Sequence, residues 1–367
     1  MSLLSVDELT VTFTGRGTRD VNAVSGVSFS VDEGQVVGLV GESGCGKSVT
    51  SLALMGLLPK RGVRVGGRAL FRTKGGESTD LLTLGRSALR DLRGPQLAMI
   101  FQDPLSSLNP VVPIGVQVTE ILARHRGMRG KAARDQAAHL LERVGIPDPA
   151  RRLREYPHQL SGGMRQRALI AMAVACAPRL LIADEPTTAL DVTIQAQILE
   201  LLKELVDDQG TALLMITHDL GVVAGLCDDV NVLYAGKVVE AAGRRPLFAA
   251  PAHPYAHGLL GSIPRLDAPR GEPLNPIRGS INDTIAWGDG CAFAPRCDFY
   301  TLRCLEGAPA LADLPGAEPA AHLVRCVNPV LNGALGAGDD GDADGAGDAG
   351  ADTESETESD TTKEASA

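Results

Sequence analysis

Residues 41–48 read Gly41-Glu42-Ser43-Gly44-Cys45-Gly46-Lys47-Ser48, which is the pattern of a phosphate-binding P-loop. The stretch follows an apolar run at 36–40, typical of a buried strand, and precedes a helix-like run at 49–57. Glycines in such a loop let successive backbone N–H groups converge on phosphates at the positive end of the following helix. The alternative, an ordinary Gly-rich turn, does not require this strand and helix around it. We therefore expect nucleotide contacts from Gly41, Ser43, Gly44, Cys45, Gly46, Lys47, Ser48 and Val49, with Lys47 on the β- and γ-phosphates and Ser48 on Mg²⁺.

Two further apolar runs end in polar residues. The run at 180–183 is followed by Asp184 and Glu185, and the run at 212–216 is followed by a segment that contains His218. Parallel sheets bind ligands beyond the carboxyl ends of their strands, so these residues are expected to lie near the P-loop. Asp184 would hold Mg²⁺ and Glu185 would polarise the attacking water. Without the P-loop upstream, paired acids after a strand would more simply be a solvated loop.

The charge of the chain is concentrated at its end. The formal net charge is -10, but residues 338–367 alone hold eleven acids and one Lys, so the rest of the chain carries 34 acidic and 34 basic side chains. A neutral body argues against general nucleic-acid binding, which requires a basic face. Apolar runs are far shorter than a membrane span, and no secretory signal opens the sequence, so we expect a cytoplasmic protein.

Composition divides the chain into three parts and predicts an α/β fold. Residues 1–240 alternate strand-like and helical patterns, with a helical subdomain expected at about 103–178. Residues 241–330 are rich in Pro and Gly and contain four of the seven Cys, which predicts a small extension that relies on cross-links or metal. Residues 331–367 lack aromatic side chains and cannot bury enough surface to order, so we predict a disordered acidic tail.

The segment Leu160-Ser161-Gly162-Gly163-Met164-Arg165-Gln166-Arg167 separates this chain from other P-loop proteins. With it, the sequence resembles the ABC ATPase family. The resemblance implies that Ser161, Gly162 and Gly163 form the signature loop, which in that family binds the γ-phosphate of ATP held on the opposite subunit. The simpler interpretation, a Gly-hinged start of a helix at 164–175, is compatible with this role because a helix N-terminus is an anion site. A dimer is therefore implied.

Further motifs match the family in its usual order. Gln102 resembles the Q-loop residue that senses Mg²⁺, Asp191 resembles the D-loop residue, and His218 resembles the switch histidine. Alone, a Gln or His would be interpreted as a surface residue. Phe13 is the candidate for stacking on adenine, although it could equally be a core residue, and Phe29 is a second early aromatic.

The resemblance extends over about residues 3–328 and is closest to the ATPases of dipeptide, oligopeptide and nickel importers. The motifs that carry it are 41–49, 101–110 and 187–192, together with 253–264 in the extension. Val49 and Met164 favour the D-type subunit over its F-type partner. The resemblance thus implies an ATPase that forms a heterodimer with an F-type subunit. It also implies two integral membrane permeases, an extracytoplasmic solute-binding protein and a position on the cytoplasmic face of the membrane.

Other functions remain open at this stage. The same subunit could serve a sugar importer or another solute importer. A non-transport ABC ATPase of DNA repair or translation would usually carry two cassettes, long coiled coils or a zinc-bearing insert. Only 113 residues separate Lys47 from Ser161, and they contain no heptads. A scaffold with an inactive site is disfavoured by the full set of catalytic residues.

The extension contains Cys291, Cys297, Cys304 and Cys326, with gaps of five, six and twenty-one residues. These gaps match neither common zinc knuckles nor the usual ferredoxin run, and disulfides are disfavoured in the cytoplasm. From the residues alone, a zinc site, another metal site or plain thiols are all possible. The family resemblance adds a [4Fe–4S] cluster, which some members bind through cysteines of this extension.

Cys45 stands near a predicted helix N-terminus, a position that lowers a thiol pKa. Like Cys176 and Cys227, Cys45 is expected to have a structural role, but its position also predicts that alkylation of the thiol inactivates the protein unless ATP is bound.

Overall fold

The computed structural model describes residues 2–15, 20–188, 190–262, 277–280, 290–318, 321–331 and 334–335. The acidic tail predicted at 331–367 lies outside the described residues, apart from positions 331, 334 and 335. The helices and strands of the fold lie in the unit formed by residues 1–336.

An eight-stranded sheet forms the centre of the fold, in the order β11-β12-β10-β9-β3-β8-β7-β6. Strands β3, β6, β7, β8 and β9 pair in parallel, whereas β10, β12 and β11 continue the sheet in antiparallel pairs. The bounds are β3 Val36–Val40, β6 Leu97–Ile100, β7 Leu180–Asp184, β8 Ala212–Thr217, β9 Asp229–Tyr234, β10 Lys237–Gly243, β11 Ala312–Asp313 and β12 His322–Val324. Every residue of β3, β7 and β8 is buried, which is why these strands are continuous apolar runs in the sequence. The three predicted strands are confirmed.

A second, antiparallel sheet has the order β2-β1-β4-β5. Its strands are β1 Ser2–Phe13, β2 Val21–Asp32, β4 Val63–Arg72 and β5 Ser78–Asp80. In β1 and β2, buried apolar side chains alternate over most of the length with more exposed ones, the pattern of a sheet that covers a core with one face. A short pair, β13 Val330–Leu331 and β14 Ala334–Leu335, lies in the C-terminal region.

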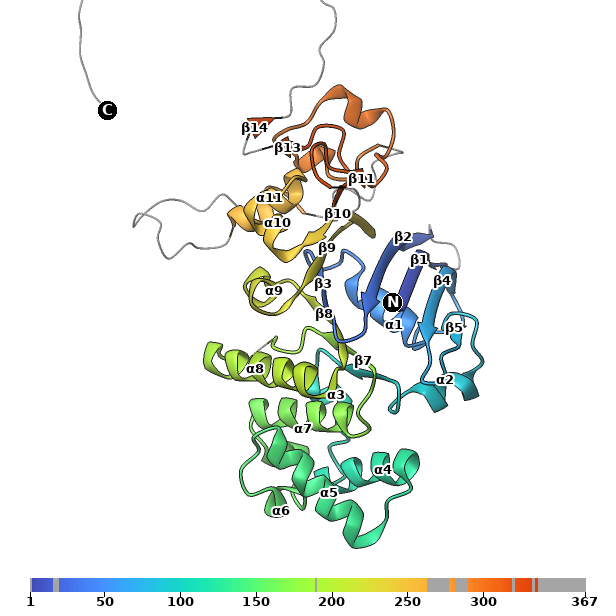
Figure 1. The fold of residues 1–367 in the computed structure, drawn as a ribbon, viewed down its shortest axis with the longest axis vertical. Coiled ribbons are helices and arrows are strands. Elements are labelled where there is room, and N and C mark those ends of the chain that lie inside the picture. The colour runs from blue at the N-terminus through green and yellow to red at the C-terminus, as the bar shows by residue number, and fades with distance from the viewer. Residues whose placement is uncertain are drawn as a thin grey trace, which may run out of the picture. The chain divides into compact units, whose positions relative to one another are not determined.

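Helices complete the fold. They are α1 Lys47–Leu54, α2 Arg86–Leu92, α3 Pro104–Ser107, α4 Ile114–Arg126, α5 Gly130–Arg143, α6 Pro149–Arg152, α7 Gly162–Val174, α8 Val192–Gln209, α9 Leu220–Leu226, α10 Arg244–Ala249 and α11 Pro254–Gly261. Helices α4 to α7 gather into one group, shown in green in Figure 1, and contact one another. These helices lie within residues 114–174, and the assignment of a helical subdomain at about 103–178 stays a prediction. No described helix is both long and apolar enough to span a membrane.

Two apolar cores lie on the two faces of the central sheet. Alternate residues of β3 divide between them: Val36 and Val40 join one core, and Val37 and Leu39 join the other. The first core includes residues of α4, α5, α7, α8 and α9, and the second includes α1 and the antiparallel sheet. The parallel strands are thus covered on both faces, as their uninterrupted apolar sequence requires.

The C-terminal extension shares the central sheet. Strand β10 runs through the boundary expected at residue 240, and β12 pairs with it antiparallel, from Glu240 with Val324 to Ala242 with His322. The His322 Nε2 atom lies 2.6 Å from the buried carboxylate of Glu240, which also accepts the N–H groups of Ala252 and His253. These contacts tie the extension to the last strands of the ATPase part.

Candidate nucleotide site

The P-loop connects the C-terminal end of β3 to α1 and opens into a cavity of about 320 Å³. The residues that line the cavity are Ala23, Ser43, Gly44, Gly46, Lys47, Ser48, Val49, Gln102 and Glu185. Gly46 has a φ of 105°, and a Cβ there would lie 2.4 Å from the carbonyl oxygen of Ala23. Only glycine fits this close approach between loop and β2. The sequence did not reveal Ala23, because its small apolar side chain carries no chemical signal.

Lys47 is buried at the start of α1. Its Nζ atom donates to the carbonyl oxygens of Gly41 at 2.7 Å and Glu42 at 2.9 Å. The ammonium group is therefore held inside the loop, where it can meet a phosphate.

Ser48 and Asp184 approach each other across the cavity edge. The Ser48 hydroxyl donates to Oδ1 of Asp184 at 3.0 Å, and the Ser51 hydroxyl lies 3.4 Å from Oδ2. Burial raises the pKa of Asp184, and the adjacent charge of Glu185 raises it further. A hydroxyl and a carboxylate oxygen are the hard ligands that Mg²⁺ takes together with phosphate oxygens and water, so these two residues fit that ion.

Glu185 is where the predicted catalytic residues meet. Its Oε2 atom accepts from Nε2 of Gln102 at 2.9 Å and from the hydroxyl of Thr188 at 2.9 Å, and its Oε1 atom lies 3.2 Å from Nδ1 of His218. Glu185 is 7% exposed and has a φ of 46°, an uncommon conformation for a residue with a side chain. The contact of Thr188 with Glu185 was not predicted from the sequence, because a threonine in a turn does not show which residue its hydroxyl bonds.

The predicted signature residues do not line the P-loop cavity of their own chain. Ser161 caps α7, where its hydroxyl accepts the N–H of Met164 at 3.3 Å, and Gly162 and Gly163 form the first turn. A Cβ on Gly163 would lie 2.9 Å from Cγ2 of Ile194, so α7 and α8 pack closely there. Asp191 caps α8 by accepting the N–H of Ile194 at 2.9 Å.

Phe13 ends β1, where it pairs with Val21 and Val63 and packs against the core of the antiparallel sheet. It does not line the P-loop cavity. An adenine-stacking role for Phe13 stays a prediction.

The expectation that the helix N-terminus lowers the pKa of the Cys45 thiol is wrong. The Cys45 side chain is fully buried, and this burial raises the pKa of its thiol, outweighing Lys47, whose Nζ lies 3.8 Å from Sγ and lowers it. The thiolate is thus disfavoured, and the sulfur is shielded from solvent in this structure. The helix N-terminus was visible in the sequence, but the burial of the thiol was not.

The four cysteines of the extension line one cavity, together with His253, Phe293 and Phe299. Burial, reinforced by the neighbouring thiols, raises the pKa of Cys297 and of Cys326 to about 12. The cavity volume is about 10 Å³, roughly the space that one water occupies. Among the described residues, no three His, Cys, Asp or Glu side chains have the geometry of a metal site. Four thiols are suitable donors for a thiolate-bound metal, but they are not arranged as a metal site in this structure, and the cavity between them is too small for an iron–sulfur cluster.

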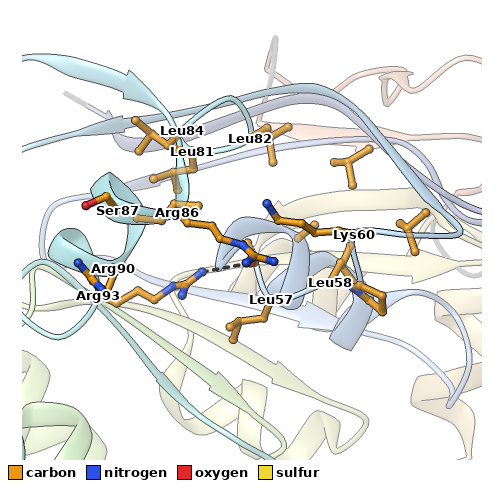
Figure 2. A pocket seen from close by; sticks show the side chains of 17 residues that line it. Leu57, Leu58, Lys60, Leu81, Leu82, Leu84, Arg86, Ser87, Arg90 and Arg93 are labelled. Carbon is orange, nitrogen blue, oxygen red and sulfur yellow. Dashed lines mark hydrogen bonds between the residues drawn. The ribbon is translucent and has the colours of Figure 1, made fainter.

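A larger cavity of about 940 Å³ lies at the opposite end of α1 from the P-loop. Figure 2 shows its leucines, including Leu81, Leu82 and Leu84, together with the basic residues Lys60, Arg86, Arg90 and Arg93. Arg93 donates to the carbonyl oxygens of Met55 and Gly56 and so closes the end of the helix. None of the predicted nucleotide contacts lines this cavity, so it is not the phosphate site.

Comparison with known proteins agrees with this geometry. A family model described as "ABC transporter" matches residues 24–188, and one described as "Oligopeptide/dipeptide transporter, C-terminal region" matches residues 239–304. The chain is 53% identical over 325 residues to the dipeptide transport ATP-binding protein DppD of Bacillus subtilis, an alignment that covers 88% of this chain and 94% of that protein. It is 46% identical over 329 residues to the oligopeptide transport ATP-binding protein OppD of Escherichia coli, covering 90% and 94% of the two chains.

Solved structures show the same fold. The dimeric structure of MJ0796, a bacterial ABC transporter cassette, aligns with a TM-score of 0.58 and 28% identity over 66% of this chain and 99% of that one. A dimeric post-hydrolysis state of MJ0796 bound to ADP and Pi gives the same TM-score with 27% identity, again over 66% of this chain and 99% of that one. The P-loop cavity, the acids of β7 and the matched C-terminal region thus lead to one assignment: the chain belongs to the ABC transporter family, among the ATP-binding proteins of dipeptide and oligopeptide transport.

Proposed function

We propose that this chain binds ATP with Mg²⁺ and hydrolyses it to energise the import of dipeptides or oligopeptides through a binding-protein-dependent ABC transporter. One observation carries the catalytic part. The carboxylate of Glu185, which lines the P-loop cavity, is held between Gln102 and His218. A base whose two oxygens are fixed by separate neighbours is oriented for a water molecule beside the γ-phosphate.

Each residue of the site has a separate role in the proposed reaction. Lys47 and the amides of the P-loop bind the phosphates, and Ser48 and Asp184 would hold Mg²⁺, which would supply neutralisation of phosphate charge. Glu185 takes a proton from the attacking water, and Gln102 and His218 position its carboxylate. Phe13 is the proposed adenine contact.

The proposed active unit is a dimer with an F-type ATPase subunit. Ser161, Gly162 and Gly163 lie outside the cavity of their own chain, and they form a helix N-terminus suited to a phosphate. In a head-to-tail dimer these residues, with Asp191 nearby on α8, would complete the site of the partner. The solved MJ0796 cassettes are dimeric, one of them with ADP and Pi.

The transport role is supported by the relatives, which are named as dipeptide and oligopeptide transport ATP-binding proteins. No described helix spans a membrane, so two permease subunits would have to form the pathway. We place the chain on the cytoplasmic face of the membrane, bound to these permeases and served by an extracytoplasmic solute-binding protein. No nucleic acid is part of the cycle.

This function is tested by purifying the chain from membranes with its permeases and assaying the complex in liposomes. We expect two integral membrane proteins and an F-type subunit to co-purify, and ATP hydrolysis to rise when peptide-loaded binding protein is added. Co-purification with ribosomes or DNA, with no response to peptide, would contradict the proposal.

We further propose that Cys291, Cys297, Cys304 and Cys326 hold a [4Fe–4S] cluster. Support comes from four thiols around one buried cavity, because thiolates are the ligands of such clusters. Burial, with a smaller contribution from the neighbouring thiols, now raises the pKa of Cys297, and a bound metal would favour its thiolate form.

Iron, acid-labile sulfide and zinc would be measured in anaerobically purified protein. Four iron and four sulfide per chain are expected, with loss of both in a Cys291→Ser/Cys297→Ser variant and retention in Cys176→Ser. Iron-free protein with stoichiometric zinc, or with neither metal, would overturn the cluster.

A further inference from the structure

The P-loop is attached to the C-terminal extension by a partly buried ion pair. The guanidinium of Arg296 donates to both carboxylate oxygens of Glu42, with Nη1 2.7 Å from Oε2 and Nη2 3.0 Å from Oε1. The two residues are separated by 254 positions in the chain. The side chain of Arg296 is 4% exposed and that of Glu42 is 29% exposed. A bidentate pair in which the guanidinium is shielded from water holds its geometry better than a fully exposed pair.

The Arg296 side chain is held by further hydrogen bonds and by two aromatic rings. Its Nε atom donates to the carbonyl oxygen of Arg278 at 2.7 Å, and Nη1 also lies 3.3 Å from the hydroxyl of Tyr234. The guanidinium carbon lies 5.7 Å from the ring centre of Tyr234 and 6.0 Å from that of Phe293. Glu42 therefore meets a rigid partner rather than a mobile arginine.

Glu42 also contacts Lys47, the lysine expected to bind phosphate. Its backbone N–H donates to the hydroxyl of Tyr255 at 2.8 Å, and its carbonyl oxygen accepts from Nζ of Lys47 at 2.9 Å. Both ends of the Glu42 peptide are thus fixed, one by helix α11 of the extension and the other by the lysine expected to bind phosphate. A shift of Glu42 would move the acceptor that holds the Lys47 ammonium.

The turn that contains Arg296 is flanked by two of the four clustered thiols. Arg296 lies in the 3-10 turn Ala294–Arg296, immediately before Cys297, and the turn begins three residues after Cys291. The N–H of Ala294 donates to the carbonyl oxygen of Cys291 at 3.0 Å, and that of Cys297 to Ala294 at 3.3 Å. A movement of Cys291 or Cys297 would therefore also move the turn that positions Arg296.

We propose that Arg296 is a positioning residue of the nucleotide site, which sets the affinity for ATP by holding the P-loop through Glu42. The inference rests on the proposed ATPase function, and it extends the site to a residue far from the P-loop in sequence. It also makes the four-thiol cluster a structural support of nucleotide binding.

The test is a binding cycle on the purified full chain with a fluorescent ATP analogue, mant-ATP, and Mg²⁺. Arg296→Met keeps much of the buried volume and removes the donors, whereas Glu42→Gln removes the charge from the P-loop side. Each variant is expected to weaken mant-ATP binding roughly tenfold, because a displaced loop loses part of its aligned contacts. The double variant should bind no more weakly than either single variant, since both changes break one interaction.

Arg303→Met is the matched control, because Arg303 is an exposed arginine of the same module, and its mant-ATP affinity should equal that of the wild type. Circular dichroism would establish that each variant is folded. If Arg296→Met does not fold, Arg296→Lys and Glu42→Gln form the cycle, with an intermediate loss expected for the lysine. Unchanged affinity in the folded variants, or additive losses in the double variant, would overturn the proposal.

A second measurement separates positioning from general destabilisation. In the assembled transporter, Arg296→Met is expected to raise KM for ATP with kcat at saturating ATP unchanged, whereas a partly unfolded population would lower kcat and leave KM alone. The latter pattern would contradict a positioning role. Failure of the wild-type chain to bind mant-ATP would instead refute the proposed function itself, so the two failures are distinguishable.

Discussion

The side-chain amide of Gln102 donates to Oε2 of Glu185 at 2.9 Å, across 83 positions of sequence. The loop after β6 is thereby joined to the acid that follows β7. Because the two strands are neighbours in the parallel sheet, their carboxyl ends bring together an amide and a carboxylate that sequence distance alone would separate.

Replacing Gln102 by Ala should remove one of the groups that orient Glu185. We expect kcat for ATP hydrolysis to fall by roughly 10- to 100-fold, with a small change in ATP affinity, because the phosphate contacts of the P-loop remain. Gln35→Ala is the control, since Gln35 bonds Asp229 and does not line the P-loop cavity. A normal kcat for Gln102→Ala would show that the hydrogen bond has no catalytic role.

Asp184→Asn should stabilise the nucleotide-free protein while it removes the Mg²⁺ site. Burial raises the pKa of Asp184, so the ionised carboxylate costs stability once the pH is above that pKa. In EDTA, the variant should therefore melt at a higher temperature than the wild type at pH 7 to 8, and the difference should shrink toward pH 4. A lower melting temperature for the variant at neutral pH would contradict the cause assigned to the shift.

The buried His253 predicts acid sensitivity of the extension. Burial lowers the pKa of His253 to about 3 from an unfolded value near 6.5, so the unfolded chain takes up a proton that the folded chain refuses. Stability is lost as the pH falls through 6.5 toward 3, by about 2 kcal/mol at pH 5. His253 Nδ1 accepts the N–H of Tyr255, a cap that asparagine can replace.

His253→Asn should accordingly lose less stability between pH 7 and pH 5 than the wild type, as measured by urea unfolding. The exposed His158, replaced in the same way, should leave the pH dependence unchanged. Identical pH profiles for His253→Asn and the wild type would rule out His253 as the acid-sensitive group.

The two signature glycines should differ in their tolerance of a methyl group. A Cβ on Gly163 would lie 2.9 Å from Ile194, whereas the nearest atom to a Cβ on Gly162 is 3.9 Å away. We expect Gly163→Ala to destabilise the chain by about 1 to 3 kcal/mol through overpacking. Gly162→Ala should be neutral or slightly stabilising, because alanine favours a helix. Thermal unfolding of both variants checks this order, and a reversed order would contradict the packing of α7 on α8.

Local features of this protein could be predicted from its sequence, and contacts between distant segments could not. The P-loop follows β3, and Asp184 ends β7 with Glu185 directly after it. Because a short apolar pattern marks each of these strands, the location of these residues at the strand ends could be predicted from the sequence. The pairing of Arg296 with Glu42 was not, because an arginine between two cysteines has the same local pattern whether it faces solvent or the P-loop. The burial of Cys45 could not be predicted for the same reason, because it depends on how the P-loop and the neighbouring strands cover the thiol.

The central claim is that Glu185 activates water for the hydrolysis of ATP bound at the P-loop, and Glu185→Gln tests it most directly. Single-turnover hydrolysis and mant-ATP binding would be measured on wild-type and variant transporter in parallel. The account predicts that the variant binds ATP with wild-type affinity and hydrolyses it at least about 100-fold more slowly. Near-normal turnover in the variant would contradict it.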